Sequence, residues 1–165
     1  MDKNELLAKE NCEVPDSYKF ILAGNSEFTI ENLNSGHNFQ YQVQRAKPRN
    51  EEEAKQEEQD EKNHIRHKDT TYFVKIKEDH DWVYAGLLVI KGSTANFYTG
   101  KKGNYSASSD AVKGLLWALK FYGKPLKRPM IMYHHGRCAR CGKPLTDAKS
   151  VSRGFGPYCY SIRLV

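Results

Sequence analysis

The sequence lacks any apolar run long enough to cross a membrane. Hydrophobic residues make up 39% of the 165 residues, and no stretch approaches the roughly 18 consecutive apolar residues that a spanning helix requires. The N-terminal residues MDKNELLAKENCE are charged and carry none of the apolar core of a signal peptide. We therefore expect a cytoplasmic protein with no membrane partner.

Cysteine is scarce and unevenly placed. The chain has 4 cysteines, and three of them, Cys138, Cys141 and Cys159, fall in its last third. Such crowding argues against a disulfide framework spread over the chain. In a reducing cytoplasm, clustered cysteines are more often metal ligands than disulfide partners. The cysteines therefore indicate a metal site near the C-terminus.

Acidic residues are nearly absent from the C-terminal third. Residues 111–165 contain eleven Lys or Arg and one acid, Asp147. Residues 51–62, EEEAKQEEQDEK, contain seven acids and two lysines, a net charge of −5. Because the whole chain carries +6, the remainder carries +11. Basicity of this kind favours an acidic partner.

The sequence also has no coherent catalytic motif. It contains no H-E-x-x-H, and His134 is followed by His135 and Gly136, so the Glu of the H-x-E motif of zinc deaminases is missing. No histidine follows His135. The segment GKKGNYS does not have the spacing of a phosphate-binding loop. We therefore expect a protein that is not an enzyme.

Alternating apolar and polar residues predict several β-strands. Residues 18–46 are typical of a strand pair or a three-stranded meander, because SEFTIEN and FQYQVQR alternate on either side of the loop NSGHN. Further strands are expected at TTYFVKIK, DWVYAGLLVI, ANFYTG and RPMIMY. The apolar stretch Ala85–Ile90 predicts a central strand covered on both faces.

One segment stands out as a helix. In SSDAVKGLLWALKFYG, Ser108 or Ser109 can cap the N-terminus, apolar residues repeat at helical spacing, and Gly123 follows where a stop is expected. Residues 2–12 predict a second, short helix. The fold class is therefore α+β: an antiparallel sheet with one main packed helix and a small C-terminal module.

The acidic tract divides the body of the protein. Residues 47–68 contain no aromatic residue and cannot bury enough apolar surface to offset the entropy of ordering. We expect a mobile loop there, or an exposed helix if packing stabilises it. The predicted organisation is a body over residues 1–133, with this loop at 47–68, and a zinc-binding C-terminal module over residues 134–165.

The C-terminal module has the spacing of a structural zinc site. In Cys138-x2-Cys141, two thiolates can bind one metal while Gly142 permits the tight turn that follows. Pro157 suits the first turn of a short helix that carries Cys159. Three thiolates and an imidazole would complete a tetrahedral site holding one Zn²⁺ per chain. We expect the imidazole to be that of His134, with His135, Cys12 or solvent as alternatives.

The segment RCARCGKPLTDAKSVSRGFGPYC resembles a small zinc-finger-like module that is common in bacteriophage proteins of unknown function. Its usual form is C-x2-C-G-[RK]-x-L-T, then Ser, then G-x-G-P-x-C, and the match covers residues 134–160. In that family a His four residues before the first Cys is frequent, which agrees with His134. The resemblance implies a phage or prophage origin and action inside an infected or lysogenic bacterial host.

Two functions fit these observations. The first, which the resemblance and the phage origin it implies suggest, is a non-catalytic inhibitor of the anti-CRISPR type. It would bind a type II CRISPR nuclease assembly, through the protein or its guide RNA, and prevent it from engaging target DNA. The second is a zinc-containing nucleic-acid-binding phage protein. The residues expected to contact the partner are basic and lie in or near the module: Lys127, Arg128, Arg140, Lys143, Lys149 and Arg153.

Overall fold

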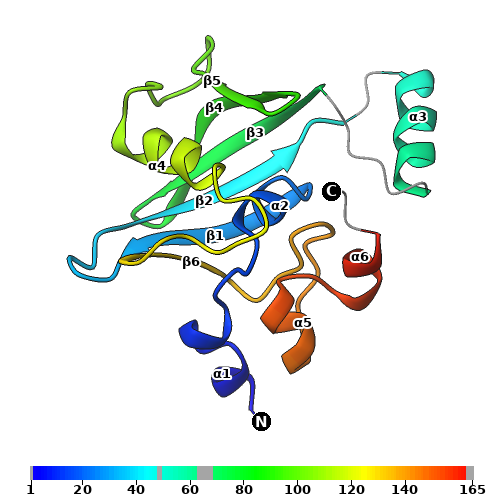
Figure 1. Ribbon diagram of the computed structural model, residues 1–165. Coiled ribbons are helices and arrows are strands. Elements are labelled where there is room, and N and C mark those ends of the chain that lie inside the picture. The colour runs from blue at the N-terminus through cyan, green and yellow to red at the C-terminus, as the bar shows by residue number, and fades with distance from the viewer. Residues whose placement is uncertain (1, 48–49, 63–68, 163–165) are drawn as a thin grey trace.

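A computed structural model describes residues 2–47, 50–62 and 69–162. Its centre is a curled, six-stranded antiparallel sheet with the strand order β5-β4-β3-β2-β1-β6 (Figure 1). The last strand in the chain therefore lies beside the first. The strands are β1 Asn25–Asn32, β2 Asn38–Arg45, β3 Asp69–Glu78, β4 Asp81–Lys91, β5 Thr94–Tyr98 and β6 Met130–His134.

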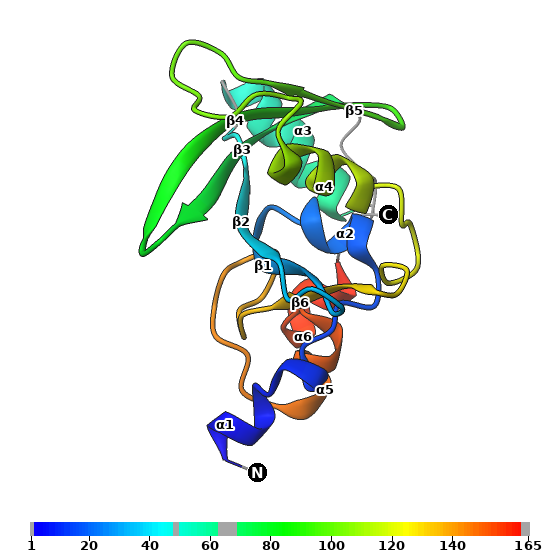
Figure 2. The same ribbon diagram turned by 90° about the vertical axis from the view of Figure 1, so that its left-hand side faces the viewer.

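The helices are unevenly distributed around the sheet. In Figure 2, α2 and α4 lie on the right-hand side of the sheet, and no helix of the described residues lies against its left-hand side, which we call the open face. The predicted α+β class is thus observed, although with several helices instead of one main helix. These are α1 Lys3–Leu6, η1 Lys9–Asn11, α2 Ser17–Ile21, α3 Glu51–Lys62, α4 Asp110–Ala118, α5 Ala148–Arg153 and α6 Pro157–Ser161.

The hairpin predicted from alternation is confirmed. β1 and β2 pair antiparallel, with Phe28 opposite Tyr41 and both side chains fully buried. The Tyr41 hydroxyl donates a hydrogen bond of 2.7 Å to the carbonyl of Ala111, at the start of α4. The sheet and the predicted helix therefore share one core, and the polar end of the buried tyrosine has a partner inside it.

Residues 17–21 form a helix, so the three-stranded meander that the sequence allowed is not formed. The Asp16 side chain caps α2 by accepting a hydrogen bond from the Lys19 amide. Phe20 and Ile21 are fully buried beneath the sheet. The short helix predicted over residues 2–12 is also interrupted, since α1 ends at Leu6 and a separate 3-10 turn follows.

The prediction that Ala85–Ile90 is covered on both faces is wrong. Leu88 and Ile90 are buried against the helices, whereas Leu87 and Val89 are only half-buried on the open face. β4 is also next to the edge of the sheet, not at its centre. An apolar run does not reveal which neighbours will cover it.

The acidic tract forms α3 over residues 51–62, which is the exposed helix that the sequence left open as an alternative. Its mobility stays a prediction, and residues 48–49 and 63–68 of the tract lie outside the described residues. Among the helices of the described chain, none is long and apolar enough to cross a membrane.

The N-terminal segment covers the outer edge of β6. The Val14 amide donates to the Met132 carbonyl (2.9 Å), and the His134 amide donates to the Cys12 carbonyl (3.0 Å). An unpaired strand edge exposes amide and carbonyl groups to other chains. Residues 12–14 satisfy part of that edge and bring the N-terminus beside the C-terminal module.

Candidate metal centre

The end of β6 leads directly into a tight loop. The Leu145 amide donates to the Gly136 carbonyl (2.8 Å), and the Cys138 amide donates to the Lys143 carbonyl (2.9 Å), so the chain doubles back on itself. The turn after Cys138 closes with a hydrogen bond of 2.9 Å from the Gly142 amide to the Cys138 carbonyl. Gly142 has φ +76°, the left-handed conformation that favours glycine. This is the knuckle predicted from Cys-x2-Cys-Gly.

Two short helices bring the third cysteine to the knuckle. Asp147 caps α5 by accepting from the Ser150 amide. α5 ends at Gly154, which has φ +80° and where an added Cβ would lie 2.7 Å from the Phe20 ring. Pro157 then occupies the first turn of α6, as predicted, and Cys159 lies buried within that helix.

The three cysteines Cys138, Cys141 and Cys159 form one cluster. Their sulfur atoms all lie within 4.8 Å of one another. Zn–S bonds of about 2.3 Å in a tetrahedral site would place sulfurs about 3.8 Å apart, so the cluster fits one metal ion. Cys138 and Cys159 are 1% and 6% exposed, whereas Cys141 is exposed at the surface. The cluster can therefore hold a metal ion at the rim of the module.

Backbone amides prepare Cys138 for the thiolate form. Burial raises the pKa of Cys138, but hydrogen bonds from the amides of Cys141, Gly156 and Arg140 outweigh it and leave the pKa below its ordinary value. The pKa of Cys159 rises to about 11, mainly because the thiol is buried. The hydrogen bond from Arg140 lowers this pKa, whereas the charge of Cys138 raises it. A divalent cation would remove this mutual repulsion of the thiolates.

Arg140 is a neighbour of the cluster that the sequence analysis did not assign to it. Its guanidinium donates to the Cys159 sulfur at 3.7 Å. The residue lies between the two cysteines of the knuckle, and that position was the only signal available in the sequence. A cation held against a thiolate favours the ionised sulfur.

The expected fourth ligand, His134, does not join the cluster. Its side chain is 2% exposed, its Nε2 lies 2.7 Å from the Val151 carbonyl oxygen, and its Nδ1 accepts from the Gly136 amide at 2.9 Å. Both ring nitrogens are therefore engaged by the backbone. The reason is its position in β6, where it pairs with Phe28 and points into the core.

The two alternative ligands also lie elsewhere. His135 places Nδ1 2.9 Å from a Glu27 carboxylate oxygen and Nε2 2.7 Å from the Thr29 hydroxyl. Cys12 is buried beside β6, where burial raises the pKa of its thiol. Among the described residues, the three clustered cysteines are the only group of three or more His, Cys, Asp or Glu placed to hold a metal.

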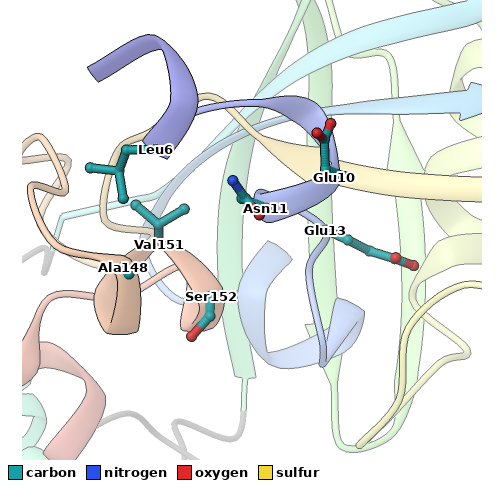
Figure 3. Close-up of a pocket in the computed structure, with 7 residues that line it drawn as sticks. All are labelled: Leu6, Glu10, Asn11, Glu13, Ala148, Val151 and Ser152. Atoms are coloured by element: carbon teal, nitrogen blue, oxygen red, sulfur yellow. The ribbon is translucent and has the colours of Figure 1, made fainter. Parts of the chain in front are cut away.

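The module shares its core with the body. Phe20 packs against His134 and Phe155, with ring centroids 6.0 and 6.1 Å apart. The module also faces the N-terminal segment, where Leu6 and Val151 point toward each other across a cleft of about 290 Å³ between that segment and α5 (Figure 3). The module is thus packed between two parts of the body that are distant in sequence from it.

The six basic residues predicted to bind the partner fall into two groups. Three are engaged within the chain: Arg128 makes a two-pronged ion pair with Glu13 at 2.7 and 2.9 Å, Arg153 lies 3.9 Å from the centre of the Tyr160 ring, and Arg140 contacts Cys159. The side chains of the other three, Lys127, Lys143 and Lys149, are exposed.

Comparison with known proteins adds one match, confined to this part of the chain. No curated protein and no solved structure matches the chain. The region that contains the end of β6 and all three clustered cysteines is similar to one family: residues 132–163 match the profile of a family of unknown function, DUF6011.

Proposed function

We propose that this protein is a non-catalytic, zinc-containing protein that acts by binding another macromolecule. The observation that carries the proposal is the Cys138–Cys141–Cys159 cluster, whose sulfurs lie within 4.8 Å of one another. Tetrahedral sites rich in thiolates are typical of structural zinc. Zinc would supply the charge that holds three thiolates together.

The role of the zinc is structural. α5 and α6 contain 6 and 5 residues, which is far below the roughly 12–15 residues at which an isolated helix becomes stable. A metal bound by the knuckle and by α6 would connect both ends of the module. Arg140, the charged neighbour of the cluster, stays protonated at any ordinary pH and cannot act as a general base.

Metal analysis tests this part of the proposal. Protein purified without chelator should contain about one zinc per chain, and Cys138→Ser or Cys159→Ser should reduce this to less than about 0.2. Cys12→Ala is the matched control, because Cys12 is equally buried but lies outside the cluster. Equal metal loss in the control, or no metal in the unaltered protein, would refute the zinc site.

The partner that we propose is a type II CRISPR nuclease assembly, which the protein would prevent from engaging its target DNA. The support for this partner is the resemblance of residues 134–160 to phage proteins and the basic surplus of the chain. The exposed Lys127, Lys143 and Lys149 can contact an acidic protein surface or the guide RNA.

The decisive measurement is target cleavage by reconstituted type II nucleases with and without excess protein. We expect cleavage to fall, and the double variant Lys143→Glu/Lys149→Glu to restore it while metal content stays unchanged. Undiminished cleavage by several such nucleases would exclude this partner and leave the zinc site untouched.

A further inference from the structure

The open face carries a row of side chains that runs across four strands. The register places Tyr98 of β5 opposite Leu87, Leu87 opposite Phe73 of β3, and Phe73 opposite Gln44 of β2. Directly opposed residues in antiparallel strands point to the same side of the sheet. Phe73 and Tyr98 are 42% and 52% exposed. The row therefore presents two aromatic rings to solvent.

A second row follows beside the first. Tyr84 of β4 pairs with Lys75 of β3, and Lys75 pairs with Gln42 of β2. The ring of Tyr84 lies 6.4 Å from that of Phe73, at an angle of 55°. The two rows together place aromatic rings, amides and a lysine side by side on one surface.

A β-bulge connects this surface to a basic loop. The ladder between β3 and β4 skips Ala85, whose carbonyl is then free to accept from the Asn104 amide at 3.2 Å. The Asn104 side chain also donates to the Tyr84 carbonyl at 2.9 Å. The loop that these bonds hold against β4 contains Lys101 and Lys102.

The loop and the sheet enclose an open cleft of about 610 Å³. Three of its lining residues are lysines, Lys75, Lys101 and Lys102, and no Asp or Glu of the described residues lines it. Phe73, Tyr84, Leu87 and Gln44 also line it. The cleft therefore combines lysines with aromatic and apolar side chains.

This combination matches the chemistry of a single nucleic-acid strand. Unpaired bases expose flat faces that stack on aromatic rings, and their phosphates attract lysines. Glutamine amides can hydrogen-bond the edges of bases. In a duplex the base faces are hidden by stacking, so exposed rings gain nothing from it.

We propose that the open face binds single-stranded nucleic acid, with bases stacked on Phe73 and Tyr98 and phosphates held by the lysines of the cleft. The site is separate from the metal cluster and does not depend on the choice of nuclease as partner. RNA and DNA single strands share this chemistry, and the test below distinguishes them.

The test is fluorescence anisotropy with labelled poly-thymidine and poly-uridine of about 12 nucleotides, within the range of known single-strand sites. At low salt the full chain should bind with a Kd of micromolar order or tighter and weaken steeply as salt rises. Phe73→Ala and Tyr98→Ala should each weaken binding at least about fivefold. Lys101→Glu/Lys102→Glu should weaken binding and flatten the salt dependence.

Matched controls separate this surface from the module. Tyr158→Ala removes an aromatic ring that is 70% exposed on α6. Lys113→Glu/Lys120→Glu reverses two exposed lysines in and just after α4, which lies on the other side of the sheet (Figure 2). Both variants should bind as the unaltered protein does. Metal content and circular dichroism must be unchanged in every variant.

Several results would overturn the proposal. One is the absence of single-strand binding, and another is equal loss in the controls. A third is tighter binding to duplex of the same length. A fourth is that Phe73→Ala loses nuclease inhibition although neither the unaltered protein nor any variant binds oligonucleotides. That result would make the open face a protein-docking surface.

Discussion

The C-terminal module and the sheet are built by different means. The module consists of a knuckle and two helices of 6 and 5 residues, positioned by glycines, a proline and an aspartate cap. The sheet consists of five antiparallel ladders between segments up to about a hundred residues apart, such as β1 and β6. Local residue chemistry defines the first region, and long-range register defines the second. We therefore expect the fold of the module to depend on bound metal and the fold of the sheet to be independent of it.

Removing the metal gives the largest expected effect. Structural zinc contributes on the order of 10 kcal/mol to the folding of small zinc peptides, so chelation should make the module susceptible to protease between Gly136 and Gly156. The sheet should stay intact. Limited proteolysis with mass spectrometry measures this. Residues 49–66 belong to the acidic tract that the sequence predicts to be mobile, so we expect protease to cleave there first, and this cleavage provides an internal reference. Equally fast cleavage within the sheet strands would show that the two regions fold as one metal-dependent unit.

Phe20→Ala tests the contact between the two regions. Phe20 is fully buried against Phe28, His134 and Phe155, so it belongs to the sheet and the module at once. We expect a loss of about 3–5 kcal/mol in the free energy of unfolding. Denaturant titration measures it, with the exposed Phe73→Ala as control. A loss below about 1 kcal/mol would mean that the regions are independent.

The pH dependence of His134 gives a smaller effect. Burial lowers the pKa of His134 below its ordinary 6.5, opposed by the Val151 hydrogen bond. The unfolded chain therefore binds the proton first as pH falls through about 6.5, and the free energy of unfolding declines below that pH while it is fully retained above it. His134→Gln should flatten this decline and keep the bound metal. Loss of metal in that variant would instead return His134 to the ligand set predicted from the sequence.

The smallest effect is expected for Arg128→Ala. The Arg128–Glu13 pair connects the segment before β6 to the N-terminal segment, but the arginine side chain is 56% exposed. Exposed ion pairs contribute about 1 kcal/mol or less, and salt screens them. Thermal unfolding in low and high salt should show a small loss that disappears at high salt. A large loss would mean that the N-terminal segment stabilises the sheet edge more than its contacts indicate.

Much of the cysteine cluster could be predicted because its signals are local. Cys138, Cys141 and Cys159 are specified by knuckle spacing, by Gly142 and by Pro157, all of which act within a few residues. The same local reasoning predicted His134 as the fourth ligand, but chain spacing does not show which way the His134 side chain points. Strand alternation decides which side of β6 the ring faces, and that side is the core, where backbone groups take both nitrogens.

The sequence by itself determined the antiparallel hairpin, a helix within residues 108–123, the acidic segment and the clustered cysteines, because alternation, helical spacing and cysteine spacing are properties of neighbouring residues. Only the tertiary structure decided that β6 lies beside β1, that α2 fills the core, and that no helix of the described residues covers one face of the sheet. The alternation in TTYFVKIK shows that Phe73 and Lys75 share a face, but not that the face is open. Which surfaces meet depends on packing between distant segments, and no local pattern contains that information.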